Sequence, residues 1–331
     1  MAISLPVAAG IFLLSAMVIL FSATFLTKAA DVIAYRMGLG RLWVGYVLLA
    51  GATSLPELST AIGASLSGYA ELAAGNMFGA NMLNMSNLAI LLALFGGRTI
   101  FQYLSSQQKL VAISAIVLTG IATLFSLLRT DIVLISISIP GIVIITTYIL
   151  LSVILRKSSK SFEEEESSDS GVSHTLKWAW IVFSICAGAI FISGPLLAVS
   201  AERIAVLTGI GSSFVGVVAL AMVTTLPELT TTATALRLGA HDMAIANMYG
   251  TNAFNIAALG VADLFFPGGS LFGATGIGNS IAGIFAVTLM GLGLVQLLTG
   301  KPLKHFSLTH PSTSLFVILY CVGLFAIFQQ A

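Results

Sequence analysis

Two glutamates with matching surroundings are the residues of this chain best suited to chemistry, because each lies within a long apolar stretch. Glu57 ends the sequence Thr-Ser-Leu-Pro-Glu, and Glu228 ends Thr-Thr-Leu-Pro-Glu. Ionisable groups in such surroundings are costly and mark ion or proton pathways. Thr53 and Thr224 stand four residues before the glutamates, so that hydroxyl and carboxylate share a helix face. The pattern indicates cation binding, and the apolar stretches contain no nucleophile–base pair typical of an enzyme.

A proline precedes each glutamate and frees a backbone carbonyl. Pro56 and Pro227 have no N–H, so the carbonyls of Ala52 and Val223 lose their helical partners. Lipid supplies no replacement donor, and a cation is one group that satisfies such an oxygen. A plain proline kink is the alternative for a single proline. Repetition of the whole motif favours a role in binding.

Asparagines follow each motif in the next apolar stretch. Asn84 and Asn255 close the two patterns, and we expect both to be ion ligands. Small neighbouring residues permit close helix approach, so amides here also suit hydrogen bonds between helices. Both interpretations, helix contact and ion binding, remain open for four further asparagines: Asn76, Asn81, Asn247 and Asn252.

Carboxylates, hydroxyls, amides and freed carbonyls together make an all-oxygen site. Hard cations such as Ca²⁺ and Na⁺ prefer oxygen, whereas zinc and copper favour nitrogen or sulfur. Two glutamates also neutralise one divalent ion, which lowers the cost of holding it inside a membrane. Cys186 and Cys321 lie in separate apolar segments, so we expect neither a disulfide nor a cysteine metal site.

The elements that position these residues must be membrane helices. The chain has 331 residues, of which 57% are hydrophobic and 8% charged, with a mean hydropathy of +1.03. A soluble domain carries roughly a quarter charged residues. The net charge of +1 indicates no nucleic-acid partner. The fold class we expect is an all-α integral membrane protein with ten transmembrane helices near 4–27, 42–67, 72–96, 110–128, 131–155, 178–201, 206–236, 242–266, 271–298 and 313–329.

Basic residues predict the orientation of these helices. With ten spans, twelve lysines and arginines fall on one side of the membrane, and only Arg129 and Arg203 fall on the other. Both termini should therefore be extracellular, with the loop 156–177 cytoplasmic. That loop contains four consecutive glutamates, Glu163 to Glu166, which we interpret as a solvated linker instead of a regulatory calcium loop. The first apolar run should be a retained helix, since no positive charge precedes it.

An internal repeat divides the chain around that loop. Residues 51–84 align without a gap on residues 222–255, an offset of 171 residues, and 14 of the 34 positions are identical. We therefore expect one five-helix repeat over 1–155 and a second over 178–331. An odd number of helices inverts the second copy across the membrane, a plan in which the ion site lies near the midplane on broken helices.

These paired motifs resemble the two alpha repeats of the cation/calcium exchanger superfamily, most closely its prokaryotic sodium/calcium exchanger branch. The resemblance implies that Glu57 and Glu228 bind Ca²⁺ and help to bind Na⁺. It also implies further ligands in both repeats. These are the hydroxyls of Thr53, Ser54, Thr224, Thr225 and Thr251, the carbonyls of Ala50 and Ala221, and the side chains of Asn84 and Asn255.

Two positions depart from the family pattern. Many relatives carry Asp where Asn255 stands, so this site has two formal charges, and Asn255 itself cannot exchange a proton. Ala80 replaces the small hydroxyl residue that its counterpart Thr251 retains. One of two repeat-related Na⁺ sites would therefore lose a ligand, which makes the Na⁺ stoichiometry an open question.

The function we expect is exchange of Na⁺ for Ca²⁺ by alternating access, with the two ions competing for Glu57 and Glu228. The protein would reside in the cell membrane, need no cofactor and work as a monomer. An exchanger that couples Ca²⁺, or another divalent ion, to protons is the alternative in the same class. A membrane cation sensor without transport is the alternative in a different class.

Overall fold

The computed structural model describes residues 4–95, 104–105, 107–134, 137–160, 174–208, 225–299 and 311–330. These residues are almost entirely helical, as predicted. The first half contains α1 (Leu5–Met37), α2 (Arg41–Trp43), the π-helix η1 (Val44–Leu49), α3 (Ala50–Thr53), α4 (Leu55–Leu66), α5 (Ala70–Phe95), α6 (Gln108–Leu127) and α7 (Ile139–Lys160). The second half contains α8 (Leu176–Thr208), α10 (Leu226–Arg237), α11 (His241–Asp263), the 3₁₀ helix η3 (Leu271–Ala274), α12 (Ile277–Thr299) and α13 (Pro311–Phe328).

Apolar side chains cover the outside of the helix bundle. Six of the described helices are long and apolar enough to cross a membrane, and a seventh span results if the bent pair Arg41–Thr53 and Leu55–Leu66 is counted as one. Large side chains such as Phe21 and Ile185 are 68% and 65% exposed, as expected of a surface that faces lipid. The chain is therefore a multi-pass membrane protein.

Polar side chains are concentrated inside the bundle, on α5 and α11. Helix α11 is buried along most of its length, and Asn247, Thr251, Asn252 and Asn255 are all at most 1% exposed. It packs against α4, α5, α6, α7 and α10. Close packing is possible because a Cβ atom on Gly250 would lie 2.5 Å from the backbone oxygen of Tyr46. Helix α11 therefore forms the polar centre around which the other helices are arranged.

Helix boundaries recur at the same 171-residue offset as the sequence motifs. Helix α1 (Leu5–Met37) corresponds residue for residue to α8 (Leu176–Thr208), and α4 (Leu55–Leu66) corresponds likewise to α10 (Leu226–Arg237). Contacts between helix ends recur too. Gln108 Nε2 donates to Asp242 Oδ1 (2.7 Å), and its counterpart Asn279 Nδ2 donates to the carbonyl of Glu71 (3.3 Å). The structural repeat thus extends well beyond the two motifs.

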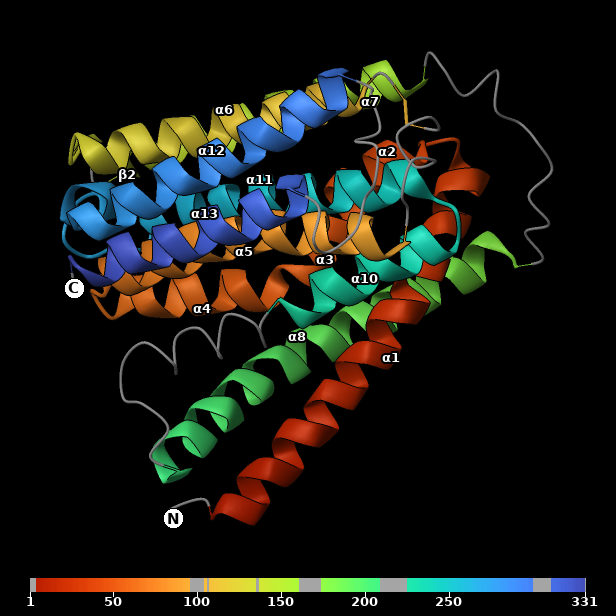
Figure 1. The fold of residues 1–331 in the computed structure, drawn as a ribbon, viewed down its shortest axis with the longest axis horizontal. Helices are drawn as coiled ribbons and strands as arrows, with labels where there is room; N and C mark the ends of the chain where they lie inside the picture. Colours follow the sequence, from red (N-terminus) through yellow and green to blue (C-terminus); the bar gives the residue numbers. More distant parts are fainter. Residues whose placement is uncertain are drawn as a thin grey trace.

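Figure 1 shows α1 and α8 as a side-by-side pair set at an angle to the remaining helices. The other helices run roughly parallel or antiparallel, so that their connections gather at two ends. At one end Trp43 Nε1 donates to the carbonyl of Ser152 (3.2 Å), and the Arg156 guanidinium lies over the Trp43 ring. We call this the basic end, because α1, α7 and α10 end there and α2, α6 and α8 begin there (Figure 1). The sequences of these helix ends contain Arg36, Arg41, Lys109, Arg156, Lys157, Lys177 and Arg237.

The opposite end carries a short hairpin, so we call it the hairpin end. Strand β1 (Val133–Leu134) pairs antiparallel with β2 (Ile137–Ser138) immediately before α7. Asp263, at the end of α11, accepts hydrogen bonds from the Ser138 hydroxyl, the Ser270 hydroxyl (3.1 Å) and the Leu271 N–H (2.5 Å). This buried carboxylate joins the hairpin to the segment that precedes α12.

Three predicted helix boundaries are wrong. The span predicted over 131–155 begins only at Ile139, because Val133–Leu134 and Ile137–Ser138 pair as short strands. The first helix continues past residue 27 to Met37, and Asp31 near its end forms an ion pair with Arg41 (2.6 Å). Helix α8 is continuous through the predicted turn at 202–205, since neither Glu202 nor Arg203 interrupts it. The sequence predicts that α1 and α8 end where charged residues follow the apolar stretch. Both helices instead continue through these charged residues.

Candidate cation site

The chain breaks within the first Thr-Ser-Leu-Pro-Glu motif. Helix α3 ends at Thr53, α4 begins at Leu55, and the two parts of the span are bent by 52°. The Ala50 carbonyl accepts hydrogen bonds from the Ser54 N–H (3.0 Å) and the Thr53 hydroxyl (3.1 Å). Pro56 occupies the first turn of α4, where a missing N–H costs nothing. The predicted broken helix is therefore confirmed for the first repeat.

The second motif has the same geometry at the start of α10. Thr225 (φ −85°, ψ 7°) caps α10 as Ser54 (φ −90°, ψ 9°) caps α4. Each glutamate consequently lies in the first turn of its helix, where free N–H groups and the helix dipole stabilise a negative charge. Thr224 and Ala221, two of the predicted ligands, lie outside the described residues.

Both carboxylates are buried and lie close to each other. Glu57 is 4% exposed and Glu228 is 1% exposed, and two ionised carboxylates in such a place would repel one another. The Ser54 hydroxyl donates across the repeats to Glu228 Oε1 at 3.5 Å. The Oε2 atom of each glutamate has no hydrogen-bond partner. Two adjacent buried carboxylates with free oxygens require a cation or a proton nearby.

Four asparagines form a symmetric hydrogen-bond network between α5 and α11. Asn81 Nδ2 donates to the carbonyl of Asn252 (3.0 Å), and Asn252 Nδ2 donates to the carbonyl of Asn81 (3.4 Å). Asn84 Nδ2 donates to Asn252 Oδ1 (3.1 Å), and Asn255 Nδ2 donates to Asn81 Oδ1 (3.0 Å). Each bond has its counterpart 171 residues away, so the two repeats interlock here. We call these four residues the asparagine quartet.

The quartet determines which way its outer amides face. A backbone carbonyl only accepts, so the amide groups of Asn81 and Asn252 must direct nitrogen toward it and oxygen toward the other partner. That oxygen in turn holds the NH₂ groups of Asn84 and Asn255. The Oδ1 atoms of Asn84 and Asn255 are left buried without a hydrogen-bond partner. Asn81 and Asn252 therefore make the helix contacts, and their arrangement orients the two predicted ligands.

Thr251 provides the remaining free oxygen among the predicted ligands. Its Oγ1 is buried and has no hydrogen-bond partner, whereas Ala80 occupies the corresponding place on α5. The free oxygens of the predicted ligands in the described part of the chain are thus Glu57 Oε2, Glu228 Oε2, Asn84 Oδ1, Asn255 Oδ1 and Thr251 Oγ1. A buried oxygen without a donor costs about 1–3 kcal/mol, and a hard cation is one group that satisfies such an oxygen.

None of the predicted ligands is a histidine or a cysteine. The described residues include no cluster of three or more His, Cys, Asp or Glu side chains, and Cys186 and Cys321 are unpaired. The site therefore combines two carboxylates with neutral oxygens, which suits Ca²⁺ or Na⁺ better than a transition metal.

Sequence reasoning did not identify two features that shape the site. The first is the contact of Gly250 with Tyr46, which no spacing in the sequence indicated. The second is a hydrogen bond from Asn247 Nδ2 to Thr231 Oγ1 (3.0 Å) and another to Thr232 Oγ1 (2.9 Å). The run of three threonines at 230–232 on a buried helix was the only available signal.

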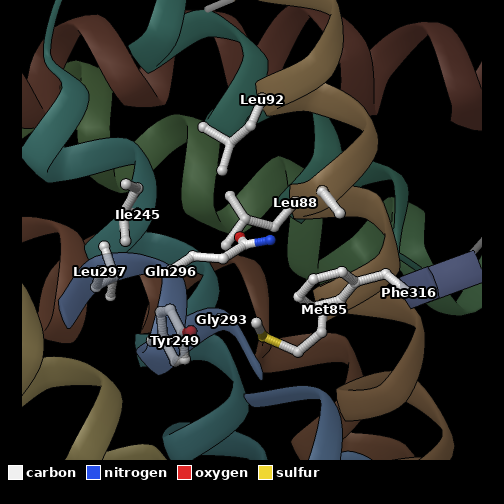
Figure 2. Close-up of a pocket in the computed structure, with 10 residues that line it drawn as sticks. Met85, Leu88, Leu92, Ile245, Tyr249, Gly293, Gln296, Leu297 and Phe316 are labelled. Atoms are coloured by element: carbon white, nitrogen blue, oxygen red, sulfur yellow. The ribbon is translucent and has the colours of Figure 1, made fainter. Parts of the chain in front are cut away.

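A small pocket elsewhere in the bundle is unrelated to the ions. Figure 2 shows it between side chains of α5, α11, α12 and α13, including Met85, Tyr249 and Phe316. Gln296 is the one amide that lines it, and none of the predicted ligands does. Its apolar lining cannot replace the hydration shell of a cation.

Comparison with known proteins identifies the family. The family model described as sodium/calcium exchanger protein matches residues 7–157 and 178–272. The chain belongs to the sodium/calcium exchanger family. Its members are transmembrane antiporters, so this exchanger-family protein is a transporter and not an enzyme.

Curated relatives and a solved structure agree with this assignment. The chain is 27% identical to the inner membrane protein YrbG of Escherichia coli over 268 residues, which are 79% of this chain and 81% of that protein. It is 26% identical to the sodium/calcium exchanger MaX1 of Methanosarcina acetivorans, over 78% of this chain and 83% of that protein. The structure of the sodium–calcium exchanger NCX_Mj soaked with 10 mM Na⁺ superposes with a TM-score of 0.73 at 20% identity. It covers 98% of this chain and 99% of that one, and it supports the fold.

Proposed function

We propose that the protein exchanges Na⁺ for Ca²⁺ across the cell membrane by alternating access, with Glu57 and Glu228 as ligands shared by both ions. The observation that carries the proposal is the set of buried, unpartnered oxygens contributed by both repeats around two neighbouring carboxylates. Family membership supports cation exchange in general. The ligand set supports Ca²⁺ and Na⁺ in particular.

Charge explains why the two ions would compete. One Ca²⁺ or two Na⁺ neutralise the two glutamates, and Asn84, Asn255 and Thr251 add no charge. Binding of one Ca²⁺ or of two Na⁺ therefore produces a site without net charge. Such a site can switch between the two sides of the membrane at a low electrostatic cost. A third Na⁺ in each cycle would make transport electrogenic.

Ten helices in two inverted five-helix repeats complete the proposal, one repeat over 1–155 and the other over 178–331. The recurrence of helix bounds at 171 residues and the interlocked quartet support it. The basic end would face the cytoplasm together with the loop 156–177, and both termini would be extracellular. All of the proposed ligands can be supplied by a single chain, and the proposal therefore takes the monomer as the working unit.

Gradient-driven flux tests this proposal. The purified protein is reconstituted in liposomes loaded with Na⁺ and diluted into Na⁺-free buffer containing ⁴⁵Ca²⁺. We expect rapid ⁴⁵Ca²⁺ uptake that stops when external Na⁺ equals internal Na⁺. Uptake that ignores the Na⁺ gradient would show that Na⁺ is not the coupling ion.

Proton coupling is the second candidate, because protons would also relieve the repulsion between Glu57 and Glu228. A pH gradient that drives ⁴⁵Ca²⁺ uptake without Na⁺ would establish it. Binding of ⁴⁵Ca²⁺ without flux under either gradient would instead indicate a membrane cation sensor. Uptake under both gradients would mean that Na⁺ and protons can each couple to Ca²⁺, whereas binding without flux rules out both exchangers.

A further inference from the structure

Three buried polar side chains of the second repeat lie outside the ligand set that the family resemblance implies. The sequence leaves both helix contact and ion binding open for one of them, Asn247. Asn247 on α11 donates to both Thr231 (3.0 Å) and Thr232 (2.9 Å) on α10, and all three residues are 0% exposed. The Oδ1 atom of Asn247 has no hydrogen-bond partner. Since the amide nitrogen is held by the two threonines, the oxygen is fixed as well and cannot turn away. We call these residues the Asn247 cluster.

The hydrogen bonds within the Asn247 cluster do not use all of the oxygen lone pairs. The Thr231 hydroxyl donates to the carbonyl of Glu228 (3.0 Å), so it accepts from Asn247 and retains one lone pair. Thr232 also accepts from Asn247 and retains one lone pair. With both lone pairs of Asn247 Oδ1, the cluster offers three neutral oxygens. Because it lacks a formal charge, it suits a monovalent cation and leaves a divalent one uncompensated.

The Asn247 cluster continues a row of free oxygens that starts at the candidate cation site. Asn255, Thr251 and Asn247 are four residues apart on α11, so they lie on one face at steps of about 6 Å. Each carries a buried oxygen without a hydrogen-bond partner. The row runs from Asn255 toward the N-terminus of α11, at the basic end of the bundle.

The first repeat lacks this row. Asn76, the counterpart of Asn247, is only half-buried, and Ala80 replaces Thr251. Ala61 stands where the second repeat has Thr232, so no hydroxyl pair faces the first amide. The oxygen row is therefore a property of the second repeat alone.

We propose that Asn247, Thr231 and Thr232 bind one Na⁺ in addition to the ions held at Glu57 and Glu228. This inference rests on the proposed function, because it identifies the bound monovalent ion with the coupling ion. The additional Na⁺ lies one helical turn beyond Thr251, on the basic-end side of the central ligands. It is bound when Na⁺ occupies the exchanger, and Ca²⁺ does not use the cluster.

Counting bound ²²Na⁺ tests the proposal. Saturating ²²Na⁺ binding per molecule is measured on purified protein for the wild type, Thr232→Ala and Asn247→Leu. Thr232→Ala recreates the alanine of the first repeat. We expect each variant to bind one Na⁺ fewer than the wild type. Thr232→Ser, which retains the hydroxyl, should bind the wild-type number, as should Thr60→Val at the first-repeat counterpart of Thr231.

Each other outcome overturns the inference. An equal number of Na⁺ ions in Thr232→Ala, Asn247→Leu and the wild type would mean that the cluster holds water only. Loss of Na⁺ in Thr232→Ser as well would mean that the cluster is needed for packing. The proposed function fails separately, when wild-type protein binds ²²Na⁺ but shows no Na⁺-driven ⁴⁵Ca²⁺ flux.

Discussion

The two repeats of this exchanger are alike where they hold charge and different where they offer neutral oxygens. Glu57 and Glu228 occupy the same turn of α4 and α10, and the asparagine quartet pairs every bond with its counterpart. The first repeat, however, has Ala80 and Ala61 at the positions that correspond to Thr251 and Thr232 of the second repeat. The shared part would provide what any cation needs. The unshared part would add neutral ligands in the second repeat only, and these could favour Na⁺ over Ca²⁺.

Loss of either carboxylate should have the largest effect, and the same effect in both repeats. Glu57→Gln and Glu228→Gln each leave one carboxylate facing a divalent ion. Removing one charged partner of a buried ion pair, here a carboxylate that would neutralise Ca²⁺, costs about 3 kcal/mol or more. This cost lowers Ca²⁺ affinity about 100-fold. We expect no measurable ⁴⁵Ca²⁺ exchange in liposomes from either variant. Full activity of one variant would show that only one repeat binds the ion.

Gly250 and its counterpart Gly79 should differ sharply when each is replaced by alanine. A Cβ atom on Gly250 would lie 2.5 Å from the Tyr46 carbonyl oxygen, whereas none on Gly79 would meet an atom within 4 Å. Overpacking of this kind costs about 1–3 kcal/mol. Gly250→Ala should unfold at a lower temperature in detergent, and Gly79→Ala should match the wild type. Equal melting temperatures would contradict the close packing of α11 on η1.

The asparagine quartet should respond equally in its two halves. Asn81→Ala and Asn252→Ala each release the amide of one ligand, which then turns freely. Loss of a group that orients a ligand weakens ion binding roughly 10-fold. We therefore expect the Ca²⁺ concentration for half-maximal exchange to rise by roughly 10-fold in each variant. Asn252→Asp keeps an oxygen for Asn84 but sets a second acceptor against the Asn81 carbonyl, so it should not restore the wild-type value.

Thr251 and Ala80 should give the smallest effect and reveal the difference between repeats. Thr251→Ala removes one neutral ligand, worth about 0.5–1.5 kcal/mol. The Na⁺ concentration for half-maximal exchange should rise by roughly 3- to 10-fold, with a smaller change for Ca²⁺. Ala80→Ser supplies the hydroxyl missing from the first repeat and should lower that Na⁺ concentration. Unchanged Na⁺ dependence in both variants would remove Thr251 from the ligands.

Much of the fold followed from the sequence because polar residues in apolar segments have few permitted places. Pro56 and Glu57 predicted a broken helix, and the structure breaks it at Ser54. The length of α1 was not predictable from hydropathy, because a helix continues past the apolar stretch when its charged residues find partners, as Asp31 finds Arg41. The start of α7 was not predictable either, because Val133–Leu134 and Ile137–Ser138 lie in an apolar stretch but pair as strands. The two interpretations of Asn81 and Asn252 could not be separated either. Whether an asparagine makes a helix contact or offers its oxygen to an ion depends on hydrogen bonds between the two repeats, which the sequence does not show.

The asparagine quartet also bears on how such a protein is assembled. Asn84 of the first repeat is oriented by Asn252 of the second, and Asn255 is oriented by Asn81 of the first. Neither half can orient its own amide. Two identical halves could satisfy the same bonds, which is the arrangement expected of an ancestral dimer before its gene was duplicated and fused. Separately expressed halves should accordingly recognise each other through their asparagines.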